Sequence, residues 1–156
     1  MYKNQIVSYT GTEGLLKATL NSLNAKGELL IFETSYASLN DMFTLDQAEE
    51  IRSQFVKRAI RVRQLTNHAY HEPYTKVKDF HQKIMNIRYI NPKKLIIRIE
   101  TLIYNDTVAM YEPKIDGFCL EIYSKELASQ QRQMFEFVWE QADRPIIGKN
   151  GRTSIF

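Results

Sequence analysis

The segment from Leu95 to Ala142 constrains the fold of this chain most, because two strands, a third strand and a helix follow one another without interruption. The run LIIRIETLIY leads into Asn105 and Asp106 and then into TVAMY, so a turn of two residues that tolerate positive φ joins two apolar runs. FCLEIY follows as a strand, and Ser124 is placed to cap a helix that reaches Ala142. The segment therefore predicts a hairpin, a third strand and a closing helix.

Upstream of this segment, helices and strands are interleaved. Leucines at i, i+1, i+5 and i+8 mark one face of a first helix, and Gly27 is its stop signal. Thr44 and Gln47 form a capping-box pattern that opens a second helix. The predicted helices are 12–25, 44–60, 75–84 and 125–142, and the predicted strands are 28–34, 61–66, 86–90, 95–104, 107–111 and 118–123. This order predicts an α/β layered fold with a mixed β-sheet that carries helices on both faces.

Length and composition indicate an ordinary globular protein. At 156 residues, with 44% hydrophobic and 25% charged side chains, the chain is about one domain with a substantial core. It contains no apolar run of roughly 18 residues and its start is too polar for a signal peptide, so we expect a cytoplasmic protein with no membrane association. The single cysteine, Cys119, lies in an apolar strand and is expected to be a buried structural thiol.

The positive charge is concentrated in the middle of the chain. Residues 52–98 contain 12 Lys and Arg against 2 Asp and Glu, which gives this block a charge of +10, although the whole chain carries only +3. Such a region is suited to a nucleic acid, a phosphorylated ligand or an acidic partner. The same residues are equally consistent with the solvated faces of a helix and two strands, since they are spread over several elements.

The segment 95–142 resembles the active-site unit of the phospholipase D superfamily. That unit carries a His-x-Lys-x4-Asp motif, whose His is the nucleophile and whose Lys holds the phosphate. Aligned on the turn, the three catalytic places hold Arg98, Glu100 and Asn105. A guanidinium does not attack phosphorus, and a carboxylate at the Lys place repels a phosphate. The resemblance therefore implies a phospholipase D-like domain without catalytic residues and without enzymatic activity.

Residues 11–142 also resemble the effector domain of TrmB-like transcriptional regulators. The matching pieces include GTEGLLKATLNSL, GELLIFET, IETLIYNDTVAMYEP and the helix that ends in FEFVWEQA. The resemblance implies a sensory or dimerisation module, a homodimer, and contact with DNA only through a winged-helix module. Only ten residues precede Gly11 here, so that module is absent from this chain, as is the sugar-binding extension of the larger family members. The expected organisation is an N-terminal extension (1–10), the effector domain (11–142) and a tail (143–156).

The three histidines offer little chemistry. His81 and Lys83 form a literal His-x-Lys, but the fifth residue beyond Lys83 is Arg88 rather than Asp, so we interpret this match as accidental. His68 and His71, at i and i+3 with an acidic neighbour, leave open a metal site, but no second cluster of ligands accompanies them. We expect no metal and no cofactor.

The candidate site follows from the ends of the strands. In α/β sheets ligands gather beyond the carboxyl ends of strands, and there the segments containing Tyr36 and His68 are expected to meet Arg98 and Glu100. The predicted site, which would bind a small effector, comprises Tyr36, His68, Arg98, Glu100 and Asn105. The alternative to a ligand-binding site is that Arg98 and Glu100 are both buried and form an internal ion pair.

Overall fold

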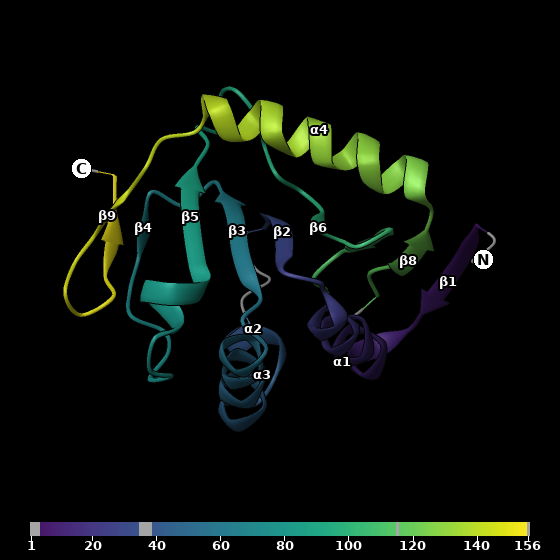
Figure 1. Cartoon of the computed structure of the whole chain (residues 1–156), viewed down its shortest axis with the longest axis horizontal. Helices are drawn as coiled ribbons and strands as arrows, with labels where there is room; N and C mark the ends of the chain where they lie inside the picture. The colour runs from purple at the N-terminus through teal and green to yellow at the C-terminus, as the bar shows by residue number, and fades with distance from the viewer. Residues whose placement is uncertain (1–3, 35–38, 115, 156) are drawn as a thin grey trace.

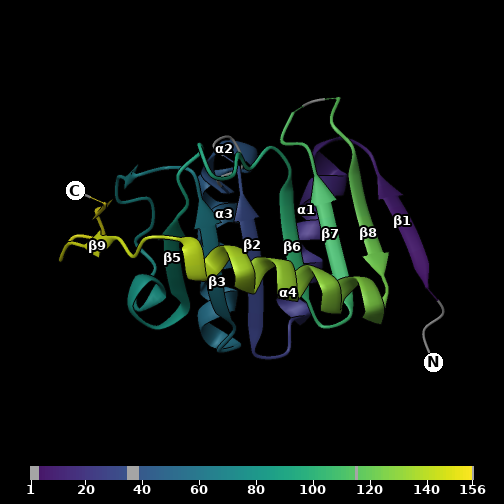
Figure 2. The same ribbon diagram turned by 90° about the horizontal axis from the view of Figure 1, so that it is seen from above.

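A seven-stranded mixed sheet forms the centre of the molecule (Figures 1 and 2). The computed structural model describes residues 4–34, 39–114 and 116–155. In space the strands follow the order β1-β8-β7-β6-β2-β3-β5, where β2, β3 and β5 are parallel and the pairs from β2 to β1 are antiparallel. Their bounds are β1 (Gln5–Tyr9), β2 (Glu28–Glu33), β3 (Arg61–Thr66), β5 (Met85–Tyr89), β6 (Glu100–Tyr104), β7 (Thr107–Tyr111) and β8 (Cys119–Tyr123).

Helices cover both faces of this sheet, as the sequence predicts. In Figure 1 the long helix α4 lies along one face, and α1 and α3 lie against the other. The helices are α1 (Gly11–Asn21), a 3-10 turn (Ser22–Asn24), α2 (Leu39–Met42), α3 (Leu45–Lys57), a π-helical turn (Phe80–Ile84) and α4 (Lys125–Gln141). None of the helices in the described ranges is long and apolar enough to cross a membrane.

The alternation of side chains along each strand divides the interior into two hydrophobic cores. Leu29 of β2 and Val62 of β3 pack with Ile51 and Phe55 of α3. One residue further along β2, Leu30 belongs to the second core, whose other buried members include Leu65, Ile103, Phe135 and Trp139. Because successive side chains of a strand point to opposite faces, this two-residue period places one core under α1 and α3 and the other under α4.

Local signals in the sequence are confirmed where a side chain satisfies the backbone. Thr44 accepts a hydrogen bond from the Gln47 backbone and Gln47 accepts one from Thr44, so the predicted capping box opens α3. Ser124 caps α4. Asn105 has a φ of 49° in the two-residue turn between β6 and β7, as the hairpin requires. Cys119 is a buried free thiol, and burial raises its pKa to about 11.

Two predicted elements are shorter than expected. The strand predicted over 95–104 begins only at Glu100, because the amide of Asn67 donates to the carbonyl of Leu95 and its oxygen accepts from the Ile97 backbone. These side-chain hydrogen bonds hold the preceding residues outside the sheet. The helix predicted over 75–84 is a single turn from Phe80, since Asp79 adopts a left-handed φ of 68° that no α-helix accommodates.

Three short strands lie where the sequence predicts loop or tail. They are β4 (Tyr70–His71), β9 (Ile146–Ile147) and β10 (Thr153–Ser154), and they form a separate small sheet in the order β4-β10-β9. At the other end of the chain, β1 arises from the predicted extension and pairs with β8 along five residues. The predicted leucine stripe of the first helix was wrong at Leu20, which is 43% exposed.

Candidate ligand cavity

A cavity of about 230 Å³ lies on the α1 and α3 side of the sheet, where β2 and β3 end. Glu33 is the last residue of β2 and shares the face of Leu29 and Ile31, because side chains alternate along the strand. Gln64 of β3 follows Val62 on the same face. The parallel pairing of β2 with β3 therefore brings an acid and an amide to the wall of one cavity.

Glu100 lies at the same place because β6 runs antiparallel to β2 and begins where β2 ends. The side chain is 4% exposed, and its Oε2 accepts a hydrogen bond of 2.9 Å from the backbone N–H of Thr34. A longer contact of 3.4 Å joins the same oxygen to the Thr34 hydroxyl. Burial and then the nearby charge of Glu33 raise the pKa of Glu100 well above its usual value.

Glu33 is the second acid of the cavity, and its ionised form is poorly compensated. Its buried Oε2 has no hydrogen-bond partner within the part of the chain that the structure describes. Burial raises the pKa of Glu33 to about 7, although hydrogen bonds with Thr66 and Gln64 act in the opposite direction. His71 also lines the cavity, and burial followed by the charge of His68 lowers its pKa.

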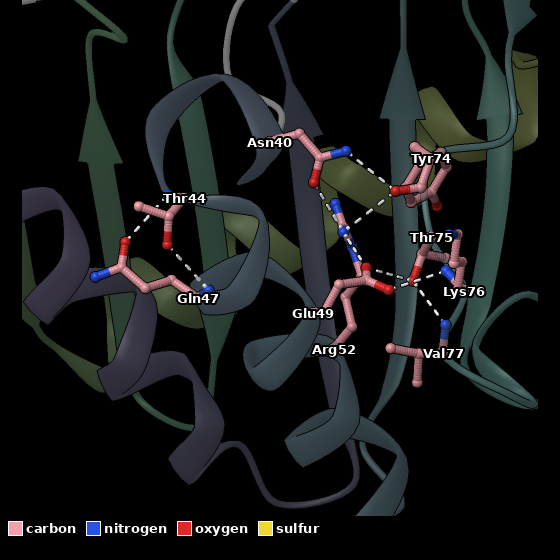
Figure 3. Close-up of polar contacts among 9 residues, drawn as sticks. All are labelled: Asn40, Thr44, Gln47, Glu49, Arg52, Tyr74, Thr75, Lys76 and Val77. Carbon is pink, nitrogen blue, oxygen red and sulfur yellow. Dashed lines mark hydrogen bonds and ion pairs between the residues drawn. The ribbon is translucent and has the colours of Figure 1, made fainter.

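A polar network around Arg52 fixes one wall of the cavity (Figure 3). Arg52 is buried in α3 and its Nη1 donates to Glu49, to Asn40 of α2 and, at 3.4 Å, to the carbonyl of Tyr74. Glu49 also accepts from the Thr75 hydroxyl and the Lys76 backbone. Burial would raise the pKa of Glu49, but the hydrogen bonds from Thr75, Lys76 and Arg52 outweigh it and the pKa is lowered.

The structure places the five predicted site residues in different parts of the molecule. Glu100 lines the cavity, whereas Arg98 is exposed, so the expectation of a buried Arg98 was wrong. Asn105 lies at the opposite end of β2, where its side chain bonds to the backbone of Asn24 and Lys26. Five strand residues separate it from Glu100 by roughly 16 Å. His68 lies beside His71, with ring centroids 5.7 Å apart, and Tyr36 falls outside the described residues.

The sequence reasoning missed Glu33, Gln64, Arg52 and His71 as cavity residues. A signal for the first two exists in the alternation of the strands. Glu33 lies two residues after Ile31, and Gln64 lies two residues after Val62, so each polar side chain must face the same side as its apolar neighbour. Arg52 and His71 carry no comparable signal. Their positions depend on the contact between α3 and the segment 70–77, which lies distant from it in sequence.

A second hollow of about 1070 Å³ lies at the amino ends of β2, β3 and β5, between the π-helical turn and the segment 147–151. His81 faces this hollow rather than the first cavity, with its ring 4.8 Å from that of Tyr74. Cationic side chains predominate in the lining, namely Arg61, Arg63, Lys78, Lys83 and Lys149 against Glu28 and Asp79. Across the described ranges, no group of three His, Cys, Asp or Glu residues is arranged to hold a metal ion.

Several solved structures share this architecture. TrmBL2, described as an archaeal chromatin protein with a novel mode of DNA binding, superposes with a TM-score of 0.61 at 14% identity over 90% of this chain. Nuc from Salmonella typhimurium, a phospholipase D family member, gives a TM-score of 0.63 at 14% identity over 91% of this chain and 98% of its own. The chain has a phospholipase D-like fold. NucT from Helicobacter pylori agrees, with a TM-score of 0.61 at 11% identity over 91% of this chain and 99% of its own.

This phospholipase D-like domain spans 55% of the length of TrmBL2. No family model and no curated protein sequence matches the chain. At such low identity the likeness establishes the fold, so the predicted resemblance to phospholipase D-like half-domains and to the TrmB-like effector domain is confirmed at that level.

The arrangement at the strand ends determines what this domain can do chemically. Three acids, an amide and a buried guanidinium line the cavity, and Glu100 occupies the place that the sequence alignment assigns to the phosphate-binding Lys. When ionised, Glu100 repels a phosphodiester, and when protonated it supplies no positive charge to hold one. The cavity therefore has the polar groups of a binding site, but Glu100 does not supply the positive charge that phosphoryl chemistry requires at this place.

Proposed function

We propose that this domain is a non-catalytic sensor and dimerisation module associated with transcriptional regulation, which binds a small effector in the cavity. The observation that carries the proposal is the polar cavity at the carboxyl ends of β2 and β3, with Glu33, Gln64 and Glu100 in its wall. Pockets with a few convergent polar groups in an otherwise apolar lining are the usual form of small-molecule sites. The volume of about 230 Å³ lies below that of drug-sized pockets and suits a small metabolite.

The residues aligned with the catalytic motif of phospholipase D, namely Arg98, Glu100 and Asn105, support the absence of catalysis in this proposal. Arg98 is exposed and Asn105 lies at the far end of the sheet, so neither is positioned to act with Glu100 on one substrate. Glu100 itself is buried and held by Thr34. Incubation with a phosphodiester chromogenic substrate should therefore give no turnover, and turnover that disappears in the His81→Ala variant would contradict the assignment.

Effector binding is tested by a metabolite screen in a thermal-shift assay followed by calorimetry. Met85 lines the cavity, and Met85→Trp should fill part of it and abolish binding of any metabolite found. Met110 provides the matched control, because it lies in β7 between residues that face the cavity side, and Met110→Trp should retain binding. A screen without a binder, or a binder indifferent to Met85→Trp, would refute a receptor role for the cavity.

A homodimer is the assembly that the fold comparison favours, since phospholipase D enzymes combine two such halves. Exposed apolar side chains on α4 support this assembly: Phe137 is 70% exposed and Met134, one turn earlier, is 51% exposed. Side chains of this kind on one helical face are typical of protein interfaces. Ligand binding would regulate transcription through such a dimer if the two pairing states differ in effector affinity.

The alternative function is nucleic-acid binding through the basic region 52–98. The specific observation in its favour is the cationic hollow with Arg61, Lys78, Lys83 and Lys149. Lys149 lies outside the block 52–98, and three members of the block are already paired internally: Arg52 with Glu49, Arg63 with Glu28 and Lys83 with Asp79. The local excess of charge available to phosphates is thus smaller than +10.

Fluorescence anisotropy with a labelled DNA duplex at several salt concentrations tests this alternative. If the hollow binds the backbone, the affinity falls with a log–log slope of about −0.9 per phosphate contacted. The double variant Lys78→Ala, Lys149→Ala should then make the slope shallower by about two. An Arg98→Ala, Lys125→Ala variant, outside the hollow, is the control, and the absence of binding at low salt would eliminate the alternative.

A further inference from the structure

We infer that the cavity accepts a ligand that carries a primary ammonium group, seated against Glu33 and Glu100. This inference rests on the proposed receptor function and names the chemical class of the effector. The geometry supplies two carboxyl groups in one cavity wall, from the end of β2 and the start of β6. A second observation points to a ligand, because the buried Oε2 of Glu33 has no partner among the described residues.

The charges around the cavity favour a cation. Glu33, Glu72 and Glu100 line it together with one guanidinium, that of Arg52. The Nη1 of Arg52 is already shared between Glu49, Asn40 and the Tyr74 carbonyl, so its charge is largely compensated from outside the cavity. An anion in the cavity would oppose the ionisation of Glu33 and Glu100, whose pKa values burial already raises. An ammonium group supplies the opposite charge and up to three N–H donors.

The remaining wall determines the rest of the ligand. Leu29, Ile31, Val62 and Leu102 contribute apolar surface next to the acids, which suits an aliphatic stem. A volume of about 230 Å³ corresponds to roughly eight water-sized groups. The expected effector is therefore a short aliphatic amine rather than a sugar or a nucleotide.

Proton linkage provides a second readout of the same site. Without a ligand the carboxyl of Glu33 has a pKa of about 7, and an ammonium group beside it stabilises the ionised form. Binding of an amine should therefore release protons near neutral pH and become tighter as the pH rises from about 6 to 8. The titratable groups around this position are Asp41 of α2, whose charge also raises the pKa of Glu33, and, in the lining, Glu100, Glu72, Arg52, His71, Tyr74 and Tyr111.

The experiment compares three probes of the same length, n-hexylamine, 1-hexanol and hexanoate, by calorimetry at pH 8, and repeats the hexylamine titration at pH 7 in two buffers of different ionisation enthalpy. Hexylamine should bind about tenfold or more tightly than hexanol, as expected for a hydrogen bond to a charged group. Hexanoate should not bind. The apparent binding enthalpy of hexylamine at pH 7 should depend on the buffer, because protons are released.

Variants connect this preference to the two acids. Glu33→Gln and, separately, Glu100→Gln should reduce the preference for hexylamine over hexanol to less than about threefold. Glu140→Gln, an exposed glutamate on α4 across the sheet, should leave it unchanged. Equal affinity for all three probes, or an amine preference that survives both Gln variants, overturns the inference.

The same data separate this inference from the receptor function on which it rests. If a neutral or anionic metabolite binds, and Met85→Trp abolishes that binding while hexylamine does not bind, the ammonium inference fails and the receptor function stands. If neither amines nor any screened metabolite bind to the cavity, both fail.

Discussion

Glu33 couples the stability of the protein to pH. Its folded pKa of about 7 is raised from an ordinary value of 4.5, so the folded state holds the proton more tightly than the unfolded chain does. The stabilisation that this provides is complete below pH 4.5 and is lost as the pH rises through 7. The upper bound is about 3 kcal/mol, at 1.36 kcal/mol for each pKa unit.

Glu33→Gln removes this dependence, because a neutral amide has no charged form to bury. The difference in the free energy of unfolding, variant minus parent, should therefore increase by about 1–3 kcal/mol when the pH is raised from 4.5 to 8. Urea denaturation at the two pH values measures the change, with Glu140→Gln as the control that shows none. A variant whose stability differs from the parent by the same amount at both pH values would contradict the assignment.

At the level of single residues, positions set by nearby residues could be predicted from the sequence, and positions set by contacts distant in sequence could not. Glu100 was predicted to be at the site because it is near the Asn105 turn in sequence. The position of Arg98 was wrong because Asn67, thirty residues away, holds the preceding backbone out of the sheet. Glu33 was overlooked, although its alternation with Leu29 and Ile31 already indicated an acid on the core side of β2.

Arg63 connects α4 to the sheet. Its guanidinium, on β3, is bonded to Glu28 of β2 and to Glu136 of α4, and it lies 5.5 Å from the ring centroid of Phe135 and 5.4 Å from that of Trp139. The two acids are 40% and 47% exposed, so each ion pair by itself contributes little. Stacking on two aromatic rings and the bidentate geometry add to these pairs.

Arg63→Met should therefore lower the free energy of unfolding by about 1–2 kcal/mol. Arg63→Lys keeps the charge without the planar fork and should lose a part of that amount. Chemical denaturation monitored by Trp139 fluorescence measures both. If Arg63→Met is as stable as the parent protein, α4 is held by apolar packing alone.

Strand β1 protects the edge of the sheet. It pairs with β8 from Gln5↔Tyr123 to Tyr9↔Cys119, and Tyr9 also packs closely on Gly14, where a Cβ would lie 2.5 Å from that of Tyr9. Removal of residues 1–9 exposes the backbone N–H and C=O groups of β8. Exposed strand edges of this kind promote association between molecules.

Deletion of residues 1–9 should lower the melting temperature by several degrees and cause concentration-dependent aggregation in light scattering. Ile6→Thr is the matched control, because this side chain is exposed and the substitution preserves the backbone pairing. A truncated protein that remains monodisperse and equally stable would show that β1 is dispensable.

Among the elements, those with local signals could be predicted and those formed by distant pairing could not. The capping box of Thr44 and the turn at Asn105 and Asp106 act within a few residues and were confirmed. By contrast, β4 and β10 are two residues long and exist only because His71 pairs with Thr153. No pattern within so short a run identifies its partner.

At the scale of the whole molecule, the role of the exposed apolar side chains on α4 in assembly can be tested directly. If Phe137 and Met134 of α4 lie in a dimer interface, Phe137→Ser should weaken the dimer by at least tenfold, as expected for the loss of a central aromatic anchor. Analytical ultracentrifugation over a concentration series measures the constant. Leu20→Ser, an exposed residue of α1 on the other face of the sheet, serves as the control.

Equal dissociation constants for the parent protein and Phe137→Ser would exclude α4 from the interface, and a monomer at all concentrations would refute the homodimer.

The fold itself could be predicted from the order of helices and strands, since α4 must cover one face of the sheet when α1 and α3 cover the other. The proposed effector and homodimer each involve a second molecule, so contacts within one chain do not predict them.

The pairing of β4 with β10 gives the cavity a mechanical readout. His71 lines the cavity, while its backbone is the register partner of Thr153 near the carboxyl end of the chain. A bound molecule that shifts the backbone of His71 would therefore shift the terminal strand as well, and Asn150 lies exposed in the adjoining turn. A fluorophore attached at position 150 would then report occupancy of the cavity as a change in fluorescence.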